Sequence, residues 1–169
     1  MKKLLLSLLV CVAGTLVASA QKAELQLGYG GYTQMDAMNM HPGGKVDAAW
    51  GALTAGVNFK VMPKVWVGPS YSFSSTQYKG SDLNAYYHVV MMNARYEYYS
   101  NSIVKLYAHF GIGADITHVS TDQETLNKGY FAFQISPVGA EVDLGNRFKM
   151  FGEAGFGAQG LVQVGFRVN

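Results

Sequence analysis

Hydrophobic and polar residues alternate along residues 102–116, SIVKLYAHFGIGADI. One face of this stretch is wholly apolar and consists of Val104, Leu106, Ala108, Phe110, Ile112, Ala114 and Ile116. The other face carries Lys105, Tyr107, His109, Gly111, Gly113 and Asp115. A period of two residues indicates a β-strand. In a soluble sheet the apolar face points into a core, whereas in a membrane barrel it points toward lipid.

Eight strand-like segments are predicted, at 24–34, 50–60, 64–75, 85–98, 102–116, 130–143, 147–157 and 160–168. The connections between them alternate in length. Those at 61–64, 99–102 and 144–147 are short, while 35–49, 76–84 and 116–129 are longer and polar; the short one at 157–160 is an exception. Outer-membrane barrels have short periplasmic turns and longer external loops. The pattern therefore favours an up-and-down barrel in an outer membrane.

The length of the central apolar face supports the same choice. From Val104 to Ile116 the strand would span about 40 Å, or roughly 29 Å along the membrane normal at a tilt of ~45°. That is close to the thickness of the hydrocarbon layer. We therefore predict an all-β protein, a single eight-stranded antiparallel up-and-down transmembrane β-barrel. A soluble lipocalin-like ligand-binding barrel, with its apolar face inward, is the alternative.

The polar face of the strands would then fill the lumen. Eight strands leave an interior that side chains can fill, so the charges should pair with one another and conductance should be small. Two prolines interrupt the pattern, and we expect a bulge at Pro137 and a local irregularity at Pro69. The predicted polar network comprises Glu24, Asn58, Lys60, Arg95, Glu97, Lys105, His109, Glu141, Glu153, Gln163 and Arg167, with Gln26, Asp115 and Lys149 on the same face.

The N-terminus has the layout of a secretory signal peptide. Lys2 and Lys3 precede an apolar run that ends at the small residues Ala18, Ser19 and Ala20. We expect residues 1–20 to be a cleaved signal peptide and 21–169 to be the outer-membrane barrel domain. The one cysteine, Cys11, lies in the signal, so the mature chain would have no disulfide.

Composition narrows the classes of function. The chain has 20 glycines, 11 tyrosines, 9 phenylalanines and 4 prolines, which is typical of many strands with tight turns. Without Lys2 and Lys3 the 13 basic residues fall to 11, against 11 acidic ones, so no basic surface indicates a nucleic-acid partner. Aromatic residues near the strand ends predict two interfacial girdles, with Trp50, Tyr86, Tyr87, Tyr130 and Phe131 near the loops and Trp66, Tyr98, Tyr99 and Phe148 near the turns.

The signal, the eight alternating segments, the three short turns and the last strand, LVQVGFRVN, together resemble the small eight-stranded outer-membrane β-barrel family, the OmpX and OmpA transmembrane-domain type. The resemblance implies an outer-membrane location, a monomer, contact with membrane lipid and lipopolysaccharide, and insertion by the outer-membrane assembly machinery. We expect a non-enzymatic envelope component with no cofactor. Its outward loops would be an interaction or adhesion surface for an extracellular protein or glycan.

One short motif offers an enzymatic alternative. His118 and Ser120, in ITHVSTDQE, resemble the His-x-Ser of outer-membrane lipid A deacylases. A histidine can activate a serine nucleophile when a carboxylate, here Glu124 or Glu141, orients the imidazole. The competing interpretation is an ordinary polar loop entrance.

A second motif offers a metal site. The segment MDAMNMH places Met35, Met38, Met40 and His41 in the first long loop. Thioether and imidazole groups are suitable ligands for Cu(I). Methionines that pack on the barrel rim are the simpler interpretation.

Overall fold

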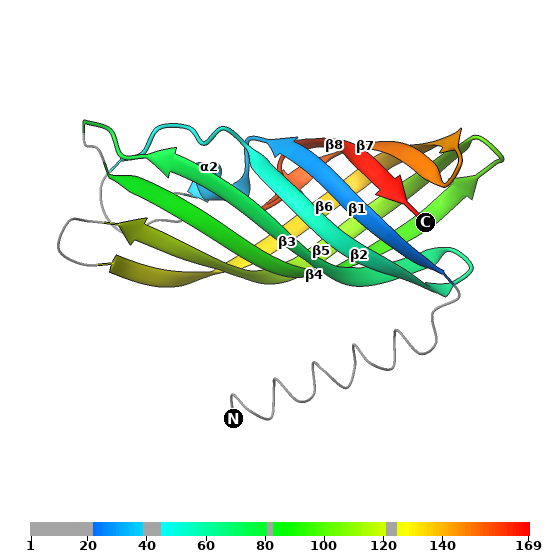
Figure 1. Ribbon diagram of the computed structural model, residues 1–169, viewed down its shortest axis with the longest axis horizontal. Helices are drawn as coiled ribbons and strands as arrows, with labels where there is room; N and C mark the ends of the chain where they lie inside the picture. The colour runs from blue at the N-terminus through cyan, green and yellow to red at the C-terminus, as the bar shows by residue number, and fades with distance from the viewer. Residues whose placement is uncertain (1–21, 39–44, 81–82, 121–124) are drawn as a thin grey trace, which may run out of the picture.

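The computed structural model describes residues 22–38, 45–80, 83–120 and 125–169, without the side chains of residues 120, 125 and 126. Its eight strands form one closed antiparallel barrel in which each strand pairs with its neighbours in sequence and β8 pairs with β1 (Figure 1). The elements are β1 (Ala23–Gly31), α2 (Gln34–Met38), β2 (Ala52–Met62), β3 (Val65–Gln77), β4 (Asn84–Ser100), β5 (Val104–Ser120), β6 (Thr125–Gly145), β7 (Phe148–Gly157) and β8 (Val162–Val168).

The apolar face of the strands points outward, as the sequence predicts for a membrane barrel. Large hydrophobic side chains on the outer wall are widely exposed, for example Leu27 at 64% and Phe131 at 66%. Glu24, Arg95 and Arg167, on the opposite face, are buried in the lumen. No helix within the described residues is long and apolar enough to cross a membrane, a finding that does not bear on crossing by strands.

The four middle strands are longer than the others. β3, β4, β5 and β6 have 13, 17, 17 and 21 residues, whereas β1, β2, β7 and β8 have 9, 11, 10 and 7. At the end that holds α2 the middle strands reach beyond the rest, and the C-terminus lies at the opposite end (Figure 1). We call the α2 end the mouth and the opposite end the turn end.

Three strand boundaries differ from the prediction by three residues or more. The predicted strand 24–34 ends at Gly31, and Gln34 begins α2. The predicted loop 116–129 is wrong for most of its length, because β5 continues to Ser120 and β6 starts at Thr125. The outward face of this segment carries His118, Asn127 and Gly129 instead of large apolar side chains, which is expected where a hairpin leaves the hydrocarbon layer.

The two prolines behave differently. The predicted bulge at Pro137 is confirmed, because the pairing of β6 with β7 shifts register between Ile135 and Val138. Pro69 keeps its register with Met92 of β4. On the β2 side, the pairs Gly56–Ser70 and Phe59–Val67 have the same register. The missing N–H of Pro69 therefore interrupts this ladder without producing a bulge.

Candidate functional site

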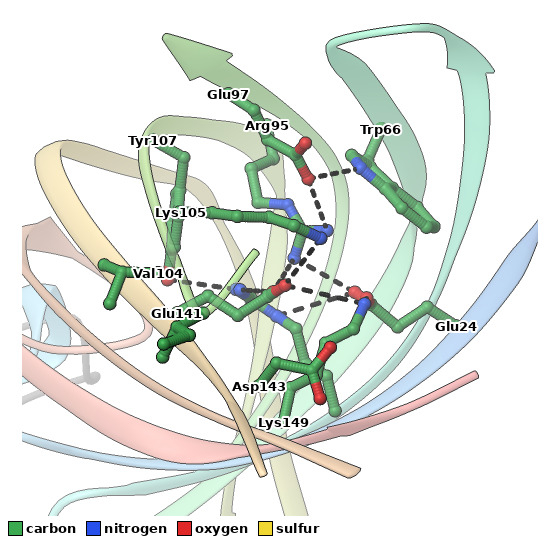
Figure 2. Close-up of polar contacts among 12 residues, drawn as sticks. Glu24, Trp66, Arg95, Glu97, Val104, Lys105, Tyr107, Glu141, Asp143 and Lys149 are labelled. Atoms are coloured by element: carbon green, nitrogen blue, oxygen red, sulfur yellow. Dashed lines mark hydrogen bonds and ion pairs between the residues drawn. The ribbon is translucent and has the colours of Figure 1, made fainter. Parts of the chain in front are cut away.

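A cluster of paired charges fills the lumen near the turn end. Arg95 Nη1 lies 3.0 Å from Glu24 Oε1, and Lys149 Nζ lies 3.0 Å from Glu24 Oε2. Arg167 Nη1 lies 2.9 Å from Glu141 Oε2. These five buried side chains come from five strands, β1, β4, β6, β7 and β8, and converge on one another (Figure 2). The cluster therefore joins opposite walls of the barrel through its centre.

Aromatic rings surround these charges. Trp66 donates from Nε1 to Glu97 Oε1 at 2.7 Å, and its ring lies 4.9 Å from the Arg95 guanidinium carbon (Figure 2). Arg167 Nη2 donates to the Tyr107 hydroxyl at 3.1 Å. The Tyr107 ring packs where any side chain at position 139 would lie, which accounts for glycine there. The rings restrict the charged groups to the lumen centre and make cation–π contacts with them.

Amides and hydroxyls form the next layer, midway along the lumen. The His109 ring lies between two oxygens, with Nδ1 2.8 Å from Glu153 Oε1 and Nε2 3.0 Å from Asn93 Oδ1. Asn93 Nδ2 and Gln159 Nε2 both donate to Ser70 Oγ, at 2.8 and 3.0 Å. These bonds connect four strands and the β7–β8 connection, so side chains fill the middle of the barrel as well.

The lumen becomes apolar toward the mouth. Met35 of α2 is fully buried and packs with residues of β4, β5 and β6, among them Tyr87, Val89 and Met91. Asp36 caps the start of α2, because its Oδ2 accepts from the Thr33 backbone N–H at 2.9 Å and from the Thr33 hydroxyl at 2.9 Å. The complete cluster, which we call the apolar plug, consists of Met35, Tyr78, Ala85, Tyr87, Val89, Met91, Val119, Ala132 and Ala158.

One carboxylate lies in the lumen without a cationic partner. Asp115 is fully buried, and its Oδ2 accepts a hydrogen bond from Thr117 Oγ1 at 2.9 Å. Its Oδ1 has no hydrogen-bond partner in the described part of the chain. No ion pair to Asp115 is found among the same residues, in contrast to the carboxylates of the charged cluster.

The Gln34 side chain attaches α2 to β6 by hydrogen bonds. Gln34 Nε2 donates to the Phe131 carbonyl at 3.0 Å, and Gln34 Oε1 accepts from the Phe133 N–H at 3.0 Å. The side-chain amide thus occupies the place of a strand beside β6, just beyond the last β7 pair, Gln134 with Gly157. Ala158 N–H, which donates to the Phe133 carbonyl at 2.8 Å, extends the same edge.

The parts of β3, β4, β5 and β6 that reach beyond the other strands at the mouth are called the projecting sheet (Figure 1). Its two edges, along β3 and along β6, differ. Along β3, Asp47 N–H donates to the Gln77 carbonyl at 2.8 Å, and Val46 forms a bridge with Tyr78. Along β6, residues 127–130 pair with β5, and on their other side no described residue pairs with them. Because backbone groups alternate in direction, Asn127 and Gly129 direct their N–H and C=O groups to this side. The β6 edge is therefore unpaired within the described residues.

The predicted lumen residues lie where the alternation places them. Lys60 and Lys105 are partly buried, with Lys60 Nζ 5.6 Å from the Trp66 ring and Lys105 Nζ 3.4 Å from Glu141 Oε1. Gln163 is fully buried, and neither of its amide atoms has a partner among the described residues. The fully or nearly fully buried members are Glu24, Asn58, Arg95, Glu97, His109, Glu141, Glu153, Gln163 and Arg167.

Sequence reasoning missed several interior residues. Trp66 and Tyr87, predicted for the interfacial girdles, are 2% and 1% exposed inside the lumen. Their parity is the missed signal, since Trp66 shares it with Ser70 and Tyr87 shares it with Arg95. Met35 and Gln34 carried no such signal, because Met35 lies outside the predicted strands and Gln34 is the last residue of the predicted strand 24–34, which in the structure ends at Gly31.

The residues of the hydrolase hypothesis are not brought together. The His118 ring bonds through Nδ1 to Asn127 Oδ1 and belongs to the outward face. Glu141 lies in the lumen and pairs with Lys105, thirteen positions along β5 from His118, about 40 Å of extended strand. Glu124 and the side chain of Ser120 lie outside the described part of the structure.

The methionines of the first loop are also separated. Met35 is fully buried in the apolar plug, whereas Met38 is 58% exposed. Met40 and His41 lie outside the described residues. Among the residues that are described, no group of three or more His, Cys, Asp or Glu side chains is arranged to hold a metal ion.

Comparison with known proteins identifies the family. The family model of the outer membrane protein beta-barrel domain matches residues 4–159. The chain belongs to this family. Its location is accordingly the outer membrane, with lipid around the apolar wall, and the lipocalin-like alternative is wrong because the apolar face points outward.

Two further comparisons were made for this outer-membrane barrel. Among solved structures it is similar to Ail, the attachment invasion locus protein of Yersinia pestis, at 14% sequence identity and a TM-score of 0.48. That similarity covers 86% of this chain and 91% of that chain. A comparison with curated proteins found no match.

Proposed function

We propose that the protein is a non-enzymatic envelope component that presents the β6 edge, residues 127–130, to an extracellular partner protein; this edge is unpaired among the described residues. The unpaired edge is the observation that carries the proposal, because an open strand edge is a template for an added strand. The orientation follows from the short turns, which face the periplasm in barrels of this kind. The projecting sheet then lies outside the cell.

The filled lumen supports an anchoring role for the barrel. The charged cluster, the middle amide layer and the apolar plug follow one another from the turn end to the mouth. We therefore propose little conductance and no cofactor. The protein would act as a monomer in contact with lipid and lipopolysaccharide, inserted by the assembly machinery and preceded by the signal peptide 1–20.

The absence of catalysis is part of the same proposal. Its support is the placement of Glu141, whose carboxylate is bound by Arg167 and Lys105 in the lumen. A hydrolase that uses His118 and Ser120 would need a different carboxylate. Replacement of Ser120 by alanine should therefore leave lipid A composition unchanged.

Proline at position 129 tests the edge. Gly129→Pro removes one edge N–H donor, and a side-chain carbon there meets nothing closer than the Asp115 carbonyl oxygen at 4.0 Å. We expect cells that carry this variant to attach about tenfold less to surfaces coated with a panel of extracellular proteins. Gly129→Ala, which keeps the N–H, should attach like the unaltered protein.

Folding is checked separately by comparing the mobility of unboiled and boiled samples in SDS gels. A closed barrel resists SDS until heated, and all three proteins should show the shift. If Gly129→Pro folds and attaches as well as Gly129→Ala, strand addition at this edge is refuted.

A further inference from the structure

Two histidines lie together on the outer wall near the mouth. His88 of β4 pairs with Ile116 of β5, and His118 pairs with Tyr86 one step along the same face. The two histidines are therefore diagonal neighbours, with ring centroids 5.2 Å apart and ring planes at 81°. Both side chains are partly buried. His118 is two residues from the end of β5, so the pair is close to the water outside the membrane.

A neighbouring side chain holds the Nδ1 atom of each ring. His118 Nδ1 is hydrogen bonded to Asn127 Oδ1, and because an amide oxygen only accepts, Nδ1 is the donor. His88 Nδ1 lies 2.6 Å from the Tyr71 hydroxyl, which can accept or donate. No hydrogen bond to either Nε2 is found among the described side chains. In His118 the Nε2 lone pair is thus available to a ligand, and in His88 it is available when Nδ1 donates.

We propose that His88 and His118 bind one Zn²⁺ ion through their Nε2 atoms, with water completing the coordination. Zn–N bonds of ~2.0–2.1 Å in tetrahedral geometry place two imidazole centroids about 5 Å apart, which matches the observed separation. Metal-binding histidines commonly donate their other ring N–H to an oxygen, as His118 does here. Nearly perpendicular rings can approach one ion without contact between their edges.

The surroundings restrict the site further. The Phe73 ring lies 5.4 Å from the His88 ring and packs against it from β3. A bound ion would therefore connect β4 and β5 beside a third strand, near the base of the projecting sheet. Met35 is not part of this site, because it is buried in the lumen and the two histidines face outward.

Zinc binding to protein without a histidine tag, folded in detergent, tests the proposal. Isothermal titration with Zn²⁺ should give one ion per chain. His88→Gln and His118→Gln should each weaken binding at least about tenfold, because either change leaves a single protein ligand. Replacing both histidines should weaken Zn²⁺ binding no further than the more damaging of the two single replacements does. Heat-dependent gel mobility should show that every variant is folded.

His41→Gln is the matched control, because it removes the loop histidine and leaves the pair intact. It should bind Zn²⁺ as the unaltered protein does. The proposal is overturned if no stoichiometric binding occurs, if binding survives both pair substitutions, or if His41→Gln alone abolishes it.

Discussion

The two halves of the lumen are filled in opposite ways. Near the turn end, charges from five strands neutralise one another across the barrel, with Arg167 between Glu24 and Glu141. Near the mouth, Met35 packs in a cluster of nine buried side chains, none of which is charged. The charged half requires a specific partner for every group, whereas the apolar half requires only a filled volume. We therefore expect the charged half to favour one register of barrel closure, and the apolar half to fill the mouth without such selectivity.

Arg167→Met should have the largest effect. The variant removes the guanidinium of Arg167, which lies within 3.6 Å of Glu24, Glu141 and the Tyr107 hydroxyl. Breaking a buried ion pair from one side costs about 3–5 kcal/mol. The urea midpoint of the barrel in lipid bilayers should fall accordingly. Lys79→Met is the control, because the Lys79–Asp47 pair is exposed and should contribute at most ~1 kcal/mol.

If Arg167→Met lowers the urea midpoint no more than Lys79→Met does, the contrast between the charged and apolar halves of the lumen is contradicted. Such a result would mean that water or rearranged neighbours replace the lost contacts, and that the charged half does not favour one register of closure.

Met35→Ala should have the next largest effect, about 2–4 kcal/mol. The substitution leaves a cavity in the apolar plug, where Met35 is fully buried. Met38→Ala, three residues along the same helix and 58% exposed, is the matched control and should change stability little. Urea unfolding measures both variants. Equal effects of the two changes would show that α2 is not a structural part of the mouth.

Asp115→Asn should have the smallest effect and the opposite sign. The substitution neutralises a buried carboxylate for which the described residues supply no cation, while the Thr117 hydroxyl can still donate to the amide oxygen. We expect the free energy of unfolding to rise by about 1 kcal/mol. Glu141→Gln, the same chemical change among four cations, should lower it. A fall with Asp115→Asn would indicate a stabilising contact for its charge.

The strand pattern of the sequence predicts most of this fold. Alternation places Glu24, Arg95 and Arg167 inside and Leu27 and Phe131 outside, because the period of two follows directly from strand geometry. The same rule applied to Trp66 and Tyr87 would have placed them inside. They were assigned to the girdles from their position near strand ends alone.

The specific partners inside the barrel could not be predicted in this way. Glu141 meets Arg167 only because β8 closes on β1 in one register, and registers are set by the closed barrel as a whole. Gln34 is a stronger example, since its amide bonds backbone groups 97 and 99 residues away. No local pattern distinguishes that glutamine from any loop glutamine.

The attachment of Gln34 to β6 also sets an order for assembly. α2 follows the first strand in sequence, yet the groups that hold it belong to the sixth. During membrane insertion the two Gln34 hydrogen bonds can therefore form only once β6 is in place, although Met35 can already pack against β4. The helix that follows the first strand is thus fully fixed only after the sixth strand is present.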